Sequence, residues 1–166
     1  MKRIAVFIIA LTCLVGAADF GLAATAPSNL AVNATVAGVC TITTAPVSFG
    51  TVTSASYTSG QGSVTVNCVQ GISYTVTLSR GGAPAGAGRA MIVGGVTMVS
   101  YELYKDAGIT LVWGDNGFAG TYPTGGGSGG QGSGAAQTTT VFGRASAVAS
   151  AAPGNYTDVV VATVNF

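Results

Sequence analysis

The sequence predicts an all-β protein built as an antiparallel sandwich. After residue 24, apolar residues recur at every second position through most of the chain, which is the spacing of half-buried strands. Turn sequences such as GQG, RGGAPAGAG, VGG, KDAG and GDNG separate these stretches, and no convincing helix follows residue 24. Many short strands at regular spacing are typical of a sandwich. The expected strands are 29–36, 39–44, 47–52, 63–69, 72–79, 89–93, 96–104, 109–113, 138–145 and 156–166.

The first 24 residues have the pattern of a secretory signal peptide. Two basic residues precede the apolar run 4–15, which is too short for a comfortable transmembrane helix. Small residues follow, and cleavage after Ala23 or Ala24 fits this pattern. We therefore expect residues 1–24 to be removed on export, leaving enough chain for one domain. A membrane anchor is the alternative interpretation of the same run.

The cysteines indicate one disulfide bond. Cys13 lies inside the apolar run and is expected to leave with the signal peptide, so Cys40 and Cys68 remain. An even number of cysteines in an exported protein favours a disulfide between them. Two buried free thiols are the alternative.

The chain after residue 24 carries almost no charge. Its basic and acidic residues are equal in number, so its net charge is zero: Arg80, Arg89, Lys105 and Arg144 against Glu102, Asp106, Asp115 and Asp158. This distribution offers no basic patch for a nucleic acid and no basic amphipathic helix for a membrane surface. A neutral, apolar surface favours association with other protein chains.

The residue types needed for catalysis are missing or scattered. The chain has no histidine, which removes the commonest general base and metal ligand. Glu102 and Asp106 are four residues apart, but a strand running into a turn should point them in different directions. We therefore expect no catalytic, metal or cofactor site and no small-molecule substrate. An aromatic cluster at 113–122 is the one candidate for a sugar-binding platform, and ordinary core packing explains it better.

The tract GGGSGGQGSG at 125–134 is low in complexity. Only a short stretch follows it, too short for a second domain, so an interdomain linker is the weaker interpretation. We expect a flexible surface loop between two strands of one domain, dispensable for folding.

Two terminal strands are unusually apolar. In the stretch 29–36, Leu30, Val32, Ala34 and Val36 share one face, and this strand lies outside the loop that the two cysteines would close. In the last strand, 156–166, both faces are largely apolar, and an apolar strand at a sheet edge invites pairing. Periodicity alone does not decide whether 29–36 completes its own sheet or pairs with another molecule.

Several short motifs occur in an informative order. They are VAGVCTI, VSFGT, GSVTVNCVQG, YTVTLSRG, RAM, VSYELYKD, WGD, TTVFGR and PGNYTDVVVATVNF. With these motifs, residues 25–166 resemble the spore coat protein U family, which includes the pilin subunits of archaic chaperone–usher pili. The Gly-rich tract 125–134 is not expected from the family.

The resemblance implies an incomplete immunoglobulin-like β-sandwich that lacks its last strand. Residues 39–166 would form the sandwich, and 25–38 an N-terminal extension that donates a strand to the next subunit by strand addition. The implied donor face is Leu30, Val32, Ala34 and Val36. The implied edge of the acceptor groove is Tyr156, Val160, Ala162, Val164 and Phe166.

The resemblance also implies the partners of the protein. A periplasmic chaperone would fill the groove first, and at an outer-membrane usher an identical or related subunit would replace it. The product is a head-to-tail homopolymer on the cell surface, because donor and acceptor lie on different surfaces. The expected role is attachment and biofilm formation. The alternatives are a spore or cell-surface coat protein of the same fold and a glycan-binding tip adhesin.

Overall fold

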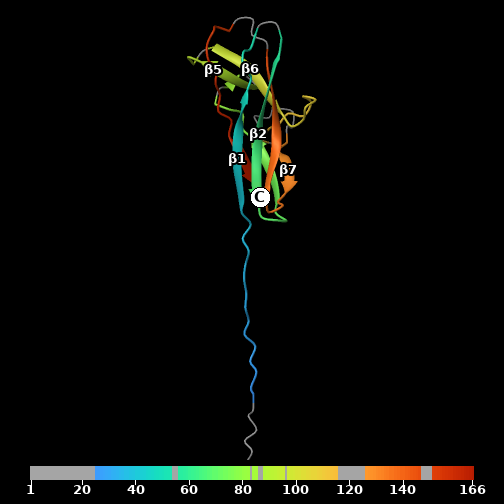
Figure 1. Ribbon diagram of the computed structural model, residues 1–166. Coiled ribbons are helices and arrows are strands. Elements are labelled where there is room, and N and C mark those ends of the chain that lie inside the picture. Colours follow the sequence, from blue (N-terminus) through green and yellow to red (C-terminus); the bar gives the residue numbers. More distant parts are fainter. Residues whose placement is uncertain are drawn as a thin grey trace, which may run out of the picture. The chain divides into compact units, whose positions relative to one another are not determined.

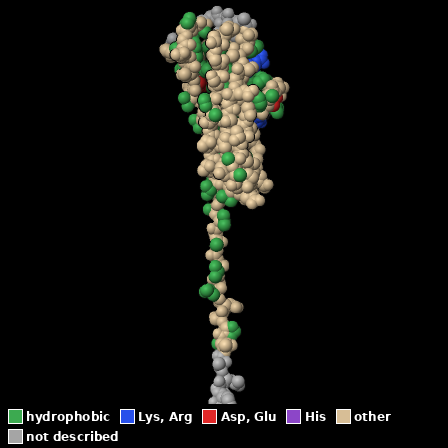
Figure 2. All heavy atoms as spheres, in the orientation of Figure 1, with side chains coloured by type: hydrophobic (Ala, Val, Ile, Leu, Met, Phe, Trp, Pro, Cys, Tyr) green, Lys and Arg blue, Asp and Glu red, His purple; other side chains and the backbone are tan. Residues whose placement is uncertain are grey.

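The computed structural model describes residues 25–53, 56–82, 84–85, 88–95, 97–115, 126–146 and 151–166. The chain divides into two units, residues 1–35 and 36–166. In the first unit the described residues 25–35 form neither helix nor strand. Hydrophobic side chains stand exposed along this segment (Figure 2), and Leu30 and Val32 are 88% and 85% exposed. The expected strand 29–36 is therefore not formed among the described residues. The expected signal peptide, 1–24, lies outside the described residues.

The second unit is a two-sheet β-sandwich, as the sequence predicts (Figure 1). Its strands are β1 (Cys40–Ser48), β2 (Thr58–Cys68), β3 (Ser73–Leu78), β4 (Pro84–Ala85), β5 (Gly88–Val93), β6 (Thr97–Tyr104), β7 (Ser128–Gln131), β8 (Ala136–Ala145) and β9 (Ala162–Asn165). The larger sheet has the order β1-β2-β8-β6-β5-β4 and the smaller one β7-β3-β9. Neighbouring strands are antiparallel, and the described residues contain no helix.

The core lies between the inward faces of the two sheets. Val64 and Val66 of β2 belong to the same buried cluster as Val76 and Leu78 of β3. Trp113 is fully buried in this cluster, and its Nε1 donates a hydrogen bond of 2.9 Å to the carbonyl oxygen of Val76. The alternation of these side chains along each strand follows from the two-residue period of a pleated sheet.

Several expected strands differ in extent from the observed ones. Most of 39–44 and only the first two residues of 47–52 belong to one strand, β1, whose register with β2 shifts between Ala45 and Ser48. The stretch 109–113 contributes a single bridge, from Val112 to Tyr104. Of the last stretch, only β9 forms a ladder. The alternation of apolar residues does not reveal a bulge or a crossing of the chain between sheets, so it could not predict these strand bounds.

The Gly-rich tract is not a flexible loop, so that prediction is wrong for its described residues, 126–134. Ser128–Gln131 forms the edge strand β7, paired with β3. Gly132 is buried, donates to the carbonyl oxygen of Ile72 over 2.7 Å and accepts from the amide of Gly71 over 2.9 Å. A Cβ at Gly132 would lie 2.8 Å from the Cβ of Cys68. Here glycine allows a close backbone approach, which low complexity in the sequence conceals.

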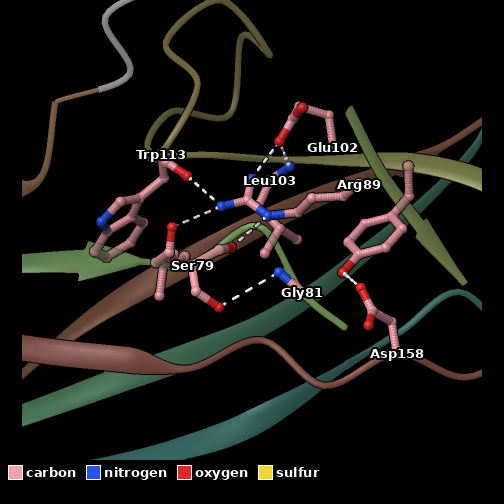
Figure 3. Close-up of polar contacts among 9 residues, drawn as sticks. Ser79, Gly81, Arg89, Glu102, Leu103, Trp113 and Asp158 are labelled. Atoms are coloured by element: carbon pink, nitrogen blue, oxygen red, sulfur yellow. Dashed lines mark hydrogen bonds and ion pairs between the residues drawn. The ribbon is translucent and has the colours of Figure 1, made fainter. Parts of the chain in front are cut away.

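A buried arginine links the sheets near the end of β3 (Figure 3). Arg89 of β5 is fully buried, and its Nη2 donates to the carbonyl oxygens of Leu78 and Trp113, each over 2.9 Å. Its Nε donates to the carbonyl oxygen of Ser79, also over 2.9 Å, and its Nη1 forms an ion pair with Glu102. The guanidinium fork supplies several donors in one plane, so it can satisfy three carbonyl groups from two segments at once.

The two carboxylates at 102 and 106 have separate partners, and the sequence predicted only that they point in different directions. Burial raises the pKa of Glu102, and the charge of Arg89 offsets part of that rise. Asp106 instead accepts hydrogen bonds from the amides of Thr110 and Leu111 within its own turn, which lower its pKa. The pair is therefore not arranged for acid–base chemistry.

Candidate strand-binding groove

An open cleft lies between two strands that do not pair with each other. β1 ends the larger sheet, β9 ends the smaller one, and the two strands come close without forming a ladder. The cleft has a volume of about 370 Å³. Buried core side chains line it: Val64, Leu78, Tyr101, Leu103 and Val141. The apolar core is thus reachable from outside along this side of the sandwich.

One wall of the cleft is the segment that leads into β9. Thr157 exchanges backbone hydrogen bonds with Ile92 of β5, at 3.0 and 3.2 Å, so the chain starts beside the larger sheet. It then reaches the smaller sheet, where the amide of Ser79 donates to the carbonyl oxygen of Val161 over 2.8 Å. The amide of Val161 donates in turn to the hydroxyl of Ser79, also over 2.8 Å. The wall is therefore held by both sheets.

The backbone of this wall presents an unpaired edge. In an antiparallel pair, successive residues turn their N–H and C=O groups to opposite sides of the strand. Both backbone groups of Val161 are directed to Ser79, so those of Val160, Ala162 and Val164 are directed away from β3. These groups are placed to pair with a further strand, in the way that an exposed sheet edge accepts one.

The other wall is the second half of β1, which the sequence interpretation did not identify. Residues 44–47, which include the register shift in β1, and Phe49, directly after the strand, line the cleft. Gly143 of β8 makes room for them, because a Cβ there would lie 2.7 Å from Val47 and 2.8 Å from the ring of Phe49. Phe49 also packs on Tyr101, with ring centroids 5.8 Å apart. The inward-facing glycine in TTVFGR was the only sequence signal for this arrangement.

The expected disulfide is present. Cys40 and Cys68 are bonded, with Cα atoms 4.1 Å apart. They face each other directly, in the first pair of the β1–β2 ladder. The bond therefore joins the beginning of β1 to the end of β2, and the alternative of two free thiols does not hold.

The predicted groove residues divide into two sets. Tyr156, Val160 and Ala162 line the cleft. Val164 packs against the buried core without lining the cleft, and Phe166 is 62% exposed. The first set thus marks the open part of the groove.

The predicted donor residues are available for contacts with another chain. Leu30, Val32 and Val36 are each more than four-fifths exposed, at 88%, 85% and 82%, and Ala34 is exposed as well. Whether they enter a groove stays a prediction, because the structure contains one molecule.

Other kinds of site find little support in the described part of the chain. No group of three His, Cys, Asp or Glu side chains there is placed to hold a metal ion. No helix among those residues is long and apolar enough to cross a membrane. Of the aromatic cluster at 113–122, Trp113 is buried and offers no exposed face, while Phe118 and Tyr122 lie outside the described residues.

Comparisons with known proteins agree with this architecture. The family model of the Spore Coat Protein U domain matches residues 24–163. No curated protein matches the sequence. Among solved structures, the chain is similar to one in the CsuC–CsuE chaperone–tip adhesion subunit pre-assembly complex, from the archaic chaperone–usher Csu pili of Acinetobacter baumannii. The identity is 24% and the TM-score 0.52, over 80% of this chain and 40% of that one.

The match to the solved structure supports the fold, and the protein spans less than half the length of that chain. The family model covers most of the sequence. The chain therefore belongs to the Spore Coat Protein U domain family and has the incomplete immunoglobulin-like sandwich predicted from its sequence.

Proposed function

We propose that the protein is a structural pilin subunit of an archaic chaperone–usher pilus. In this proposal residues 25–38 of one subunit supply a strand that fills the cleft between β1 and β9 of the next. The observation that carries the proposal is the cleft itself, where buried core side chains and a free strand edge are open to a partner. The exposed donor face, Leu30, Val32, Ala34 and Val36, matches it in chemistry.

The expected energetics favour a long-lived link. Burying Leu30 and each valine of that face contributes roughly 1.5–3 kcal/mol per side chain. Each backbone hydrogen bond to the free edge adds roughly 0.5–1.5 kcal/mol. Since donor and acceptor are different surfaces of one chain, the contact repeats head to tail and builds a filament.

The finer features of the proposal follow from the same groove. Before assembly, a periplasmic chaperone fills the apolar cleft and keeps it from other contacts. At an outer-membrane usher, the next subunit then takes the place of the chaperone. The similar solved structure is itself a complex between a chaperone and a tip adhesion subunit. The signal peptide expected at 1–24 would direct export, and the assembled fibre would serve attachment and biofilm formation. Such a subunit needs no catalytic group.

The decisive experiment separates folding from polymerisation. A copy of 29–36 fused behind Phe166 through a flexible linker fills the groove of its own chain, and folding is then measured alone. Leu30→Asp in the original segment should leave this folded state intact. In the unfused chain the same substitution should abolish polymerisation, because an unpaired carboxylate in an apolar groove costs several kcal/mol.

Asn33→Asp is the matched control, because Asn33 alternates with the apolar face and keeps the added charge in water. It should polymerise nearly as well as the unchanged chain. A Leu30→Asp chain that fails to fold even when its groove is filled would place 29–36 inside its own domain and contradict the proposal.

A coat protein of a spore or cell surface is the second candidate, favoured by the description of the family. Electron microscopy of cells with and without the gene separates the two, since a pilus appears as fibres and a coat as a continuous layer.

A further inference from the structure

One turn holds both ends of the groove wall. The turn Ser79–Gly82 follows β3, and the wall segment is Asp158–Val161. At one end, the amide of Gly82 donates to Oδ1 of Asp158 over 2.8 Å. At the other end, Ser79 and Val161 exchange two hydrogen bonds of 2.8 Å. The backbone between Asp158 and Val161 is therefore held at both ends by hydrogen bonds to this turn.

Asp158 also reaches the opposite sheet. The hydroxyl of Tyr101, on β6, donates to Oδ2 of Asp158 over 2.7 Å (Figure 3). The amide of Val159 donates to Oδ1 over 2.8 Å, so both carboxylate oxygens are engaged. Burial, and then the hydrogen bond to Asp158, raise the pKa of Tyr101, so its hydroxyl remains a donor to Asp158. The carboxylate thus joins the turn after β3, the wall and the floor of the cleft.

Val160, one of the two residues between Asp158 and Val161, is the one a partner strand would meet. The side chain of Val160 lines the cleft and is half-buried. Its N–H and C=O groups are directed to the open edge, because those of Val161 are directed to Ser79. Holding these groups in place before binding removes an ordering cost from the binding step.

We infer that Asp158 is a positioning residue for strand uptake: through Tyr101 and Gly82 it holds the wall at Val159–Val160 in the geometry that an incoming strand requires. The inference rests on the proposed function and adds a residue to it. A role in folding alone would lower stability without a specific effect on uptake.

The test measures uptake of a labelled peptide, residues 25–38, by fluorescence anisotropy in a stopped-flow instrument. The acceptor is the full exported chain carrying Leu30→Asp, which cannot serve as donor while its own cleft is unchanged. Adding Asp158→Asn should slow association roughly tenfold, since the amide cannot accept all the hydrogen bonds that the carboxylate accepts.

Asp106→Asn is the matched control. Asp106 also accepts several hydrogen bonds within a turn, from Thr110 and Leu111, but it does not line the cleft. It should lower the thermal midpoint without changing the association rate. Tyr101→Phe removes only the hydroxyl and should slow uptake in part. The double variant with Asp158→Asn should be no slower than Asp158→Asn alone, because both remove one contact.

The outcomes are distinguishable. An unchanged rate in Asp158→Asn, or an equal slowing in Asp106→Asn, overturns the inference and leaves the proposed function intact. If the acceptor with Leu30→Asp alone takes up no peptide, the proposed function fails and the inference with it. If Asp158→Asn does not fold, Tyr101→Phe decides, and an unchanged rate there overturns the inference.

Discussion

The guanidinium of Arg89 donates a hydrogen bond of 2.9 Å to the carbonyl oxygen of Trp113, inside the core and beside its ion pair with Glu102. Replacing Arg89 by Met should therefore destabilise the sandwich by roughly 3–5 kcal/mol, the usual cost of removing one partner from a buried ion pair. Urea unfolding of the groove-filled protein measures this loss.

Arg144→Met provides the control, because Arg144 lies over the ring of the exposed Tyr57, 3.6 Å from its centroid. Its loss should cost only roughly 0.5–1 kcal/mol. Equal losses in the two variants would show that Arg89 contributes no more than the half-buried Arg144.

The stability of the Arg89→Met variant should show a defined pH dependence. Burial already raises the pKa of Glu102, and removing Arg89 takes away the charge that opposes this rise. A carboxylate whose folded pKa lies above its unfolded value stabilises the fold below the unfolded pKa and loses that contribution as pH rises through the folded one. The stability gap between Arg89→Met and the unchanged protein should therefore widen from about pH 4 to pH 7. A constant gap would contradict this account.

Amide hydrogen exchange should report strand uptake in alternate residues of the groove wall. In the empty protein, the amide of Val161 is bonded to Ser79, while those of Val160, Ala162 and Val164 face the open edge. Binding of the 25–38 peptide should protect these three amides strongly and change Val161 little. Protection of Val161 and Thr163 instead would mean that the peptide displaces β9 from β3.

Gly132 should tolerate a larger side chain poorly. Gly132→Val forces a Cβ to within 2.8 Å of Cys68 and should cost roughly 1–3 kcal/mol, as overpacking usually does. Gly129→Val is the comparison in the same tract, since the nearest atom there lies 3.7 Å away. Thermal unfolding should separate the two variants. If both behave alike, the tract is a loop after all.

Ile109 should be a site where substitution stabilises the protein. Its φ is +56°, a left-handed conformation that costs a β-branched residue roughly 1–3 kcal/mol. Ile109→Gly should relieve that strain and, after the entropy cost of glycine, raise stability by roughly 1 kcal/mol. Ile109→Val keeps the β-branch and should bring no gain in the denaturant midpoint.

Much of the fold follows from apolar alternation, because alternation is a direct record of which side chains face the core. The β3, β5 and β6 strands were predicted close to their observed positions, and Cys40 and Cys68 pair as their number suggested. The resemblance to the family, not alternation, implied one wall of the groove, around Val160 and Ala162, and both residues line the cleft.

The remaining features depend on backbone proximity, which alternation does not record. The second wall depends on an irregularity in β1 and on the space above Gly143. The strand β7 is made of residues with low strand propensity, and its pairing with β3 overrides that propensity. In the sequence, Asp158 is one of four scattered acidic residues. Only the fold brings it beside Tyr101 and Gly82.

The position of the disulfide decides how the subunit would carry a mechanical load. In a fibre built as proposed, tension enters each subunit through the extension that precedes Cys40. Without the disulfide, that pull would open the β1–β2 ladder one hydrogen bond at a time, starting from its first pair. Because Cys40 is bonded to Cys68 at that pair, the force passes covalently into β2. β2 is an interior strand, paired along its length with β8, so the load spreads over a ladder that must shear as a whole.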